Sequence, residues 1–283
     1  MQHVLPLAPT ILVTGANGRV GQLVRRAWPM RPGPRLFTLS RKWGADIVWS
    51  PGHGLPCTLP RCSAVIALWG VTHGSPRDLS CNTELAHRAT DLAHATGATR
   101  LFHMSSAAVY GPGRALYEDA SPRPVSDYGR AKAAMEDAVL RLAERDPGLR
   151  QCCLRVGNIL GACQLTPALC GTGPVTLDQH PGGYGPRRSY VDATGLALIL
   201  AGLLALPAQR LPPVLNLATS STLDMQDIAR AARVPILWRT PAADALPDVT
   251  LDLSRLAGLL PDHPLELSAA ALVTRWRQCL IPA

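Results

Sequence analysis

Short apolar runs alternate with helical segments along the first part of the chain. The run Thr10–Thr14 is apolar or β-branched throughout, which is typical of a strand buried on both faces of a parallel sheet. Similar runs predict strands at Leu36–Leu39, Ile47–Trp49, Ala64–Leu68, Arg100–Ser105 and Gln151–Val156. Helices are predicted after the first strand as far as Trp28, where Pro29 and Pro32 end the helix, and over Leu79–Thr96 and Tyr128–Arg145. This alternation predicts an α/β fold with a doubly wound parallel sheet.

The pattern changes after Gly161. Residues 161–188 are rich in Gly, Pro and Thr and are expected to leave the sheet. An apolar helix over 193–206 and a strand over Val214–Leu217 are expected to return to it, and short helices broken by prolines are expected from there to Ala283. We therefore expect two parts, one formed by residues 1–160 with 189–218, and a small mixed part formed by residues 161–188 and 219–283.

Composition narrows the class of protein. Of the 283 residues, 47% are apolar and only 17% are charged, which provides ample material for a core. The longest apolar stretch, Gly195–Pro207, is shorter than the roughly 18 residues of a membrane span. No secretory signal is recognisable and the eight cysteines include no C-x-x-C pair, so we expect reduced thiols and a cytoplasmic location.

The net charge of +8 admits two kinds of anionic partner. Nucleic acid is one, but the arginines are scattered rather than clustered in blocks. A groove for an anionic small molecule explains the charge equally well. We expect a small-molecule ligand, no nucleic acid and no membrane.

A glycine-rich turn joins the first strand to the first helix. In such a turn the first glycine permits a tight bend, the second lets the backbone approach a pyrophosphate, and the third lets the helix pack on the strand. The anion then lies at the helix N-terminus. Its place between strand and helix predicts a dinucleotide site at Gly15, Asn17, Gly18, Arg19, Val20 and Gly21. A tight turn without a ligand is the alternative.

Tyr128 and Lys132 form a second candidate site on a predicted helix. They are four residues apart, so their side chains share one face. An ammonium beside a phenol lowers the pKa of the phenol from about 10, which makes Tyr128 a usable acid and base. Ser106, at the end of the fifth strand, is placed to bond the same substrate oxygen. Taken alone, the Tyr-x-x-x-Lys pair is also compatible with an ordinary surface helix.

These motifs, with Ser105-Ser106-Ala107-Ala108-Val109-Tyr110-Gly111, resemble the extended short-chain dehydrogenases/reductases of the NAD-dependent epimerase/dehydratase family. The resemblance covers most of residues 10–218. It implies a Rossmann fold, a nucleotide-sugar substrate, a homodimer, and a catalytic triad of Ser106, Tyr128 and Lys132. It also makes residues 1–160 with 189–218 the dinucleotide-binding domain, and the remainder the substrate-binding domain.

The resemblance implies further site residues. Asp46 and Ile47 correspond to a pair beside the adenine, although a surface turn is the alternative. Leu68, Trp69 and Gly70 follow the fourth strand, where the family lines the nicotinamide pocket. The remaining correspondences are Asn82 near the cofactor, Ala107 and Asn158 near the substrate, and Arg188 at the substrate phosphate.

Departures from the family pattern concern the reaction. Sugar-nucleotide dehydratases carry Asp-Glu directly after the catalytic Ser or Thr, whereas this chain has Ala107 and Ala108, whose methyl groups transfer no proton. Dehydratase chemistry is therefore disfavoured, and epimerase and ketoreductase remain. The family's Gly-Pro is Gly161-Ala162 here, and Asp192 and Gly195 replace its usual His and Asp, so the identity of the sugar stays open.

Two smaller questions concern cofactor and metal. The second strand ends at Ser40 and Arg41 without the acid that usually holds the ribose 2′-hydroxyl of NAD, which gives a slight preference for NADP. An arginine in solvent is an equally good interpretation. His87, Asp91 and His94 share a helix face but have no supporting ligands, so no metal is predicted.

The sequence therefore predicts an NAD(P)-dependent epimerase or ketoreductase that acts on a hydroxyl or ketone of a nucleotide sugar. A reductase of a non-sugar carbonyl and a non-catalytic NAD(P)-binding redox sensor are the alternatives, because a fold does not fix a function.

Overall fold

A parallel sheet forms the centre of the computed structural model, which describes residues 9–28, 33–171, 173–263 and 265–280. Its strands are β1 (Thr10–Thr14), β2 (Arg35–Ser40), β3 (Ile47–Val48), β4 (Ala64–Ala67), β5 (Arg100–Ser106), β7 (Arg150–Val156) and β11 (Val214–Leu217). The order is β11-β7-β5-β4-β1-β2-β3, and every neighbouring pair is parallel. The predicted doubly wound α/β fold is confirmed.

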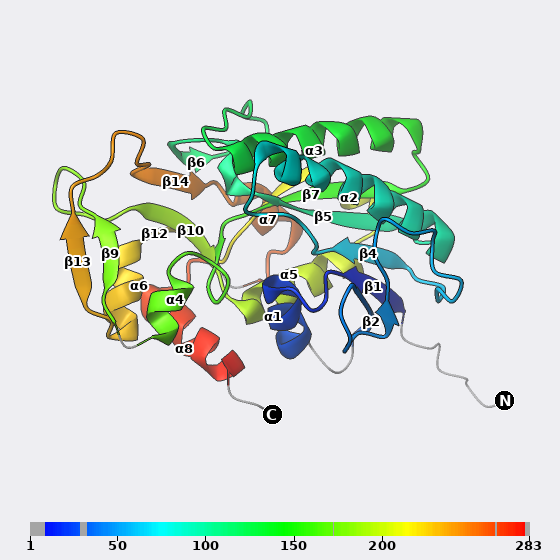
Figure 1. Ribbon diagram of the computed structural model, residues 1–283, viewed down its shortest axis with the longest axis horizontal. Helices are drawn as coiled ribbons and strands as arrows, with labels where there is room; N and C mark the ends of the chain where they lie inside the picture. The colour runs from blue at the N-terminus through cyan, green and yellow to red at the C-terminus, as the bar shows by residue number, and fades with distance from the viewer. Residues whose placement is uncertain (1–8, 29–32, 172, 264, 281–283) are drawn as a thin grey trace.

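Helices cover both faces of this sheet (Figure 1). Helices α2 (Pro76–Thr96) and α3 (Asp127–Arg145) pack on each other along one face, and α1 (Arg19–Ala27) and α5 (Ala193–Ala205) pack on each other along the opposite face. The sequence sets the ends of α2: Ser75 and Asp78 form a reciprocal capping box, and Gly97 closes the helix in the left-handed conformation. Helix α5 is apolar on almost every side, which is typical of a helix buried in the core.

A second, smaller part lies beside the carboxyl edge of the central sheet. One sheet has the order β12-β10-β14-β6, and β8 also pairs with β10. These strands are β6 (Gly113–Leu116), β8 (Asn158–Ile159), β10 (Arg187–Val191), β12 (Ser220–Asp224) and β14 (Asp248–Leu251), and a separate pair joins β9 (Val175–Asp178) to β13 (Ile236–Arg239). The remaining helices are α4 (Thr166–Cys170), α6 (Met225–Ala232), α7 (Ser254–Leu259) and α8 (Ala269–Leu280), with 3₁₀ turns η1 (Ala107–Val109) and η2 (Ala208–Arg210).

The sequence analysis was wrong about the end of the chain. It predicted only short helices there, whereas β12, β13 and β14 lie among them. It also missed β6 and β9, and β10 joins the second sheet. These strands have four or five residues each and pair with distant segments, so no local periodicity marks them. Helix α1 ends at Ala27, and Pro29 and Pro32 lie outside the described residues. The division into two domains stays a prediction.

The two sheets meet where the candidate site residues lie. Strand β7 continues through Gly157 into β8, and Asn158 and Ile159 pair with Tyr190 and Val191 of β10. A side chain at Gly157 would come within 2.5 Å of the carbonyl oxygen of Ser189, so only glycine allows this approach. The second sheet therefore begins at the carboxyl end of the first, where ligands of doubly wound folds bind.

Candidate active site

The glycine turn after β1 has the geometry of an anion site. Gly15 has φ +66°, and a Cβ on it would lie 2.6 Å from the backbone nitrogen of Trp69. A Cβ on Gly21 would lie 2.3 Å from the carbonyl oxygen of Gly15. Gly18 is the N-cap of helix α1 and has no side chain to cap the first backbone N–H groups. The turn thus leaves a helix N-terminus open to a phosphate, so the residues present fit a dinucleotide.

Asn17 connects this turn to the segment that follows β2. Its side-chain amide donates to the carbonyl oxygens of Lys42 at 3.1 Å and Trp43 at 2.8 Å, and its oxygen accepts from Arg25 at 2.7 Å. Asn17 therefore fixes the 41–44 segment. Arg41 is exposed within that segment, and the Ser40 hydroxyl accepts a bond from the Lys42 backbone.

Asp46 is engaged by its neighbour in β2. Its carboxylate accepts bonds from the backbone nitrogen of Thr38 at 2.8 Å and from the Thr38 hydroxyl at 2.6 Å. Burial alone would raise the pKa of Asp46, but these two bonds outweigh it and hold the pKa below its usual value. Ile47 lies buried in β3. The carboxylate thus holds the turn between β2 and β3.

Asn82 holds the loop after β4. Its oxygen accepts from the backbone nitrogen of Val71 at 3.1 Å, and its amide donates to the carbonyls of Val71 at 2.9 Å and Leu79 at 2.8 Å. Leu68, Trp69 and Gly70 lead into this loop, and Trp69 packs against Trp49 with ring centroids 6.1 Å apart. These contacts occupy both polar atoms of the Asn82 side chain, so it orders the loop rather than offering a free group.

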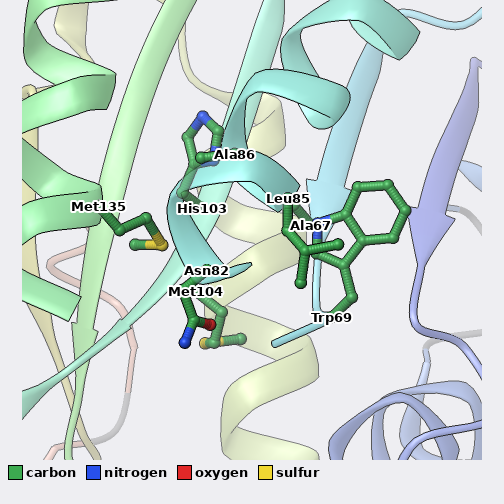
Figure 2. Close-up of a pocket in the computed structure, with 8 residues that line it drawn as sticks. All are labelled: Ala67, Trp69, Asn82, Leu85, Ala86, His103, Met104 and Met135. Carbon is green, nitrogen blue, oxygen red and sulfur yellow. The ribbon is translucent and has the colours of Figure 1, made fainter. Parts of the chain in front are cut away.

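A small cavity lies behind this loop, between β4, β5, α2 and α3 (Figure 2). His103 on β5 borders the cavity, and its ring forms a 2.9 Å hydrogen bond with the side chain of Gln151. Full burial lowers the pKa of His103 to about 4, which makes this histidine neutral at physiological pH. The residues around the cavity are Ala67, Trp69, Asn82, Leu85, Ala86, His103, Met104 and Met135.

Ser106, Tyr128 and Lys132 come together where β5 ends and α3 begins. The Ser106 hydroxyl accepts a hydrogen bond from the backbone of Ala108 at 3.2 Å, and it is near enough to the Tyr128 phenol to lower the pKa of Tyr128. Gly129 allows the close approach, because a Cβ there would lie 2.4 Å from the carbonyl oxygen of Ala108. Lys132, one turn further along α3, is only 3% exposed and donates to the carbonyl of Met104 at 2.8 Å.

The sequence analysis predicted a lowered pKa for Tyr128, and this direction was wrong. Burial raises the pKa of Tyr128, and the neighbouring Ser106 hydroxyl opposes this only in part. The expected lowering by Lys132 is not seen, because the ammonium is directed to Met104. Burial also lowers the pKa of Lys132 to about 8, and the neighbouring Cys153 and Glu136 oppose this lowering in part.

Three candidate substrate residues lie on nearby elements. Ala107 is buried in η1 next to Ser106, and Asn158 is half-buried in β8. The Arg188 guanidinium, from β10, donates to the carbonyls of Arg187 at 2.7 Å, Leu246 at 2.8 Å and Pro247 at 3.2 Å. These three acceptors are neutral, so they leave the positive charge of Arg188 unbalanced and available to an anionic ligand.

The sequence analysis missed a buried ion pair beneath these residues. Arg155 of β7 contacts both carboxylate oxygens of Glu136, the shortest distance being 2.7 Å, and Ser105 donates to the same carboxylate. The available signal was Glu136 itself, one helical turn beyond Lys132 on the sheet-facing side of α3.

Elsewhere, the histidine face of α2 is used in other contacts. His94 pairs with Asp146 at 2.7 Å, and Asp91 with Arg88 at 3.4 Å. Within the part of the chain that the structure describes, no group of three or more His, Cys, Asp or Glu is arranged to hold a metal ion. No helix of the described residues is long and apolar enough to cross a membrane.

The comparison with known families supports the assignment made from the motifs. Residues 57–170 match the model of the NAD dependent epimerase/dehydratase family, and this stretch contains Ser106, Tyr128 and Lys132. The predicted resemblance is therefore confirmed, and so is the prediction that the chain is an enzyme.

The individual proteins that this chain resembles are distant from it in sequence. This chain is 27% identical over 251 residues to the dTDP-6-deoxy-L-talose 4-dehydrogenase (NAD(P)(+)) of Kitasatospora kifunensis. The match covers 77% of this chain and 76% of the relative. The solved structure of MoeE5 in complex with UDP-glucuronic acid and NAD matches with a TM-score of 0.78 and 20% identity, over 96% of this chain and all of that one. Thermus thermophilus UDP-glucose 4-epimerase in complex with NAD matches at 0.69 and 21% identity, over 95% of this chain and 99% of the epimerase. At such identities these two structures show the fold alone.

Proposed function

We propose that this enzyme interconverts a secondary hydroxyl and a ketone on the sugar of a nucleotide sugar, with an NAD(P) cofactor and Ser106, Tyr128 and Lys132 as its catalytic group. The observation that carries the proposal is the close packing of the start of α3, which carries Tyr128, against the turn after Ser106, beside the buried ammonium of Lys132. These three side chains lie at the carboxyl edge of the sheet, as the glycine turn does.

Each residue of the group has a separate task. Ser106 orients the substrate oxygen, because its hydroxyl lies at the end of β5 and near enough to the Tyr128 phenol to lower the pKa of Tyr128. Tyr128 transfers the proton to or from that oxygen. Burial raises the pKa of Tyr128, so the phenol is protonated at neutral pH and acts first as an acid, in the direction of ketone reduction.

Lys132 supplies the positive charge of the site. Its ammonium is held by Met104 and lies close to Gly70, where a Cβ would come within 3.3 Å of the nitrogen. Because residue 70 is a glycine, there is room around the ammonium of Lys132. We assign this ammonium to binding the cofactor ribose. The cofactor, when bound, supplies hydride chemistry at the nicotinamide ring.

The residues after Ser106 favour hydride transfer without loss of water. Ala107 and Ala108 carry no group that exchanges a proton, so no second acid and base stands beside Tyr128 in this turn. The name of the curated relative, a 4-dehydrogenase of a dTDP-linked deoxysugar, supports an enzyme that only oxidises or reduces its sugar substrate. An epimerase is the second candidate, because the same three residues and the same hydride chemistry also serve oxidation followed by return of the hydride to the opposite face of the keto-sugar.

We assign the substrate diphosphate to Asn158 and Arg188. The basis is the charge of Arg188, which is half-buried and held in place by neutral carbonyls, and whose pKa is lowered by burial. A partly buried cation whose partners are neutral gains from an anionic ligand. A pyrophosphate, which every nucleotide sugar carries, satisfies this requirement.

Finer properties remain part of the proposal. We propose a slight preference for NADP, supported by the exposed Arg41 and by the absence of an acid at the end of β2. A homodimer and a cytoplasmic location stay predictions.

The test offers purified enzyme a panel of dTDP- and UDP-linked 4-keto-6-deoxyhexoses with NADH or NADPH. A reductase consumes the reduced cofactor and yields an alcohol. An epimerase instead changes the configuration of a nucleotide sugar that already carries a hydroxyl, using retained NAD⁺ and without net consumption of cofactor. If neither change occurs on any nucleotide sugar while the enzyme reduces simple ketones, the sugar assignment is wrong.

A further inference from the structure

A buried polar network links the three parallel strands β5, β7 and β11 to helix α3. At its centre, the side chains of Glu136 and Arg155 are only 2% and 5% exposed. The strand register places Ser105 opposite Arg155, and both side chains bond the Glu136 carboxylate. One carboxylate therefore connects helix α3 to two neighbouring strands.

The network continues on the far side of Arg155. Its guanidinium lies 4.6 Å above the ring of Tyr110 and donates to the carbonyl of Glu118 at 3.0 Å. Tyr110 in turn donates to Asn216 of β11 at 2.8 Å, and the Asn216 backbone donates to the Glu118 carboxylate at 3.0 Å. The segment after Ser106 is thereby fixed to β7 and β11.

Glu136 lies directly next to the catalytic group in the chain and in space. Tyr128, Lys132 and Glu136 follow one another at intervals of four residues, and all three contact the end of β5. Lys132 contacts Met104, Glu136 contacts Ser105, and Tyr128 lies beside Ser106. These three partners are consecutive residues of β5. The carboxylate thus fixes the rotation of α3 that brings Tyr128 onto Ser106.

We infer that Glu136, held by Arg155 and Ser105, is a positioning residue that fixes α3 against β5 and thereby places Tyr128 and Lys132. This inference rests on the proposed function of that group. It adds a role that none of the three catalytic residues supplies, because Lys132 has a neutral carbonyl and a thioether as its hydrogen-bond partners.

Several groups surround Lys132, and their charges distinguish Glu136 from the rest. Cys153 of β7 and His103 of β5 are uncharged at neutral pH, because burial raises the pKa of Cys153 and lowers the pKa of His103. Asn82 of α2 is neutral, Tyr128 is a neutral phenol, and Arg155 carries a positive charge. Among these groups, only Glu136 carries a negative charge. Cys153 and, after it, Glu136 are the two groups that raise the pKa of Lys132 against burial.

The composition of the chain allows a direct measurement of this effect. The sequence contains only two lysines, Lys42 and Lys132. A Lys42→Arg chain labelled with ¹³C at lysine therefore gives one lysine signal, and its chemical shift against pH reports the pKa of Lys132 without any substrate. The experiment compares Glu136→Gln, which keeps the acceptor oxygen and removes the charge, with Asp137→Asn, which removes an exposed charge from the next position.

In Glu136→Gln we expect the pKa of Lys132 to fall by about 1 unit, since removal of an opposite charge one helical turn away shifts a pKa by up to that order. Asp137→Asn leaves the pKa unchanged. The pH at which kcat declines moves down with the Lys132 titration, and Glu136→Asp recovers the pKa more fully than it recovers kcat. An unchanged Lys132 pKa in Glu136→Gln overturns the inference.

Arg155 requires a second variant, because Glu136→Gln leaves its charge buried and unpaired. Glu136→Gln/Arg155→Met removes both charges and is expected to fold, with a smaller fall in the Lys132 pKa. If neither variant folds, the pair serves stability alone and the inference is wrong. Turnover that survives Tyr128→Phe rejects the proposed function instead, and it leaves the Lys132 titration unaffected.

Discussion

The ammonium of Lys132 donates a 2.8 Å hydrogen bond to the backbone carbonyl of Met104, in a site where burial lowers the pKa of Lys132 to about 8. The lysine is therefore charged below that pH and neutral above it. If its charge holds the cofactor, dinucleotide affinity falls as the pH rises through about 8. Titration calorimetry across that range checks this, with Lys132→Met as control. Equal pH dependence in both proteins contradicts the assignment.

Gly18 is the glycine whose substitution separates binding from folding. Its φ of −71° suits any residue, and a Cβ there meets only the Gly15 carbonyl at 3.1 Å. A valine at this position occupies the approach of the pyrophosphate, so Gly18→Val loses dinucleotide binding and keeps its thermal unfolding temperature within a few degrees. Gly52→Val is the matched control, because a Cβ at Gly52 meets nothing within 4 Å. Unchanged affinity in Gly18→Val would exclude this turn as the cofactor site.

Arg41 tests the cofactor preference. A charge-assisted bond to a 2′-phosphate contributes on the order of 1.5–3 kcal/mol. Arg41→Ala should therefore weaken NADP binding by roughly ten- to a hundredfold, since each 1.4 kcal/mol is tenfold, and should leave NAD binding almost unchanged. Arg145→Ala, an exposed arginine at the end of α3, controls for net charge. Equal losses for both dinucleotides, or no loss, would mean that Arg41 does not select the cofactor.

Arg188 tests the substrate side of the site. If its guanidinium binds the substrate diphosphate, Arg188→Gln raises KM for the nucleotide sugar about tenfold or more and changes kcat little, because the contact is uniform along the reaction. Arg187→Gln is a neighbouring control, since Arg187 stacks on the ring of Tyr184 at 4.0 Å. A KM that rises equally in both variants would point to local disorder of β10 instead.

The sequence was sufficient for the central sheet, because its strands are continuous apolar runs. Strands β1 and β11 begin and end where the pattern predicts, and the glycine turn and the Tyr128–Lys132 spacing are equally local signals. Strands such as β6 and β14 carry no such signal, since they are short and pair across a long stretch of chain. Their existence depends on tertiary contacts.

The chemistry of the site depended on burial and orientation. The spacing of Tyr128 and Lys132 correctly placed both on one helix, but it did not reveal that the ammonium is directed to Met104 or that burial dominates the pKa of Tyr128. The role of Asn82 likewise became visible only through its bonds to Val71. Hydrogen bonds to backbone carbonyls leave no trace in residue spacing.

The central claim is that Tyr128 transfers the proton while a hydride passes between the cofactor and the sugar. The most direct measurement uses reduced cofactor deuterated at nicotinamide C4 with a nucleotide-linked 4-keto-6-deoxyhexose, and mass spectrometry of the sugar product. We predict that the deuterium appears on the carbinol carbon with wild-type enzyme, and that Tyr128→Phe slows its transfer by about 10²–10⁴-fold while still binding dinucleotide. Deuterium transfer at the wild-type rate in Tyr128→Phe, on whichever substrate is turned over, would contradict the account.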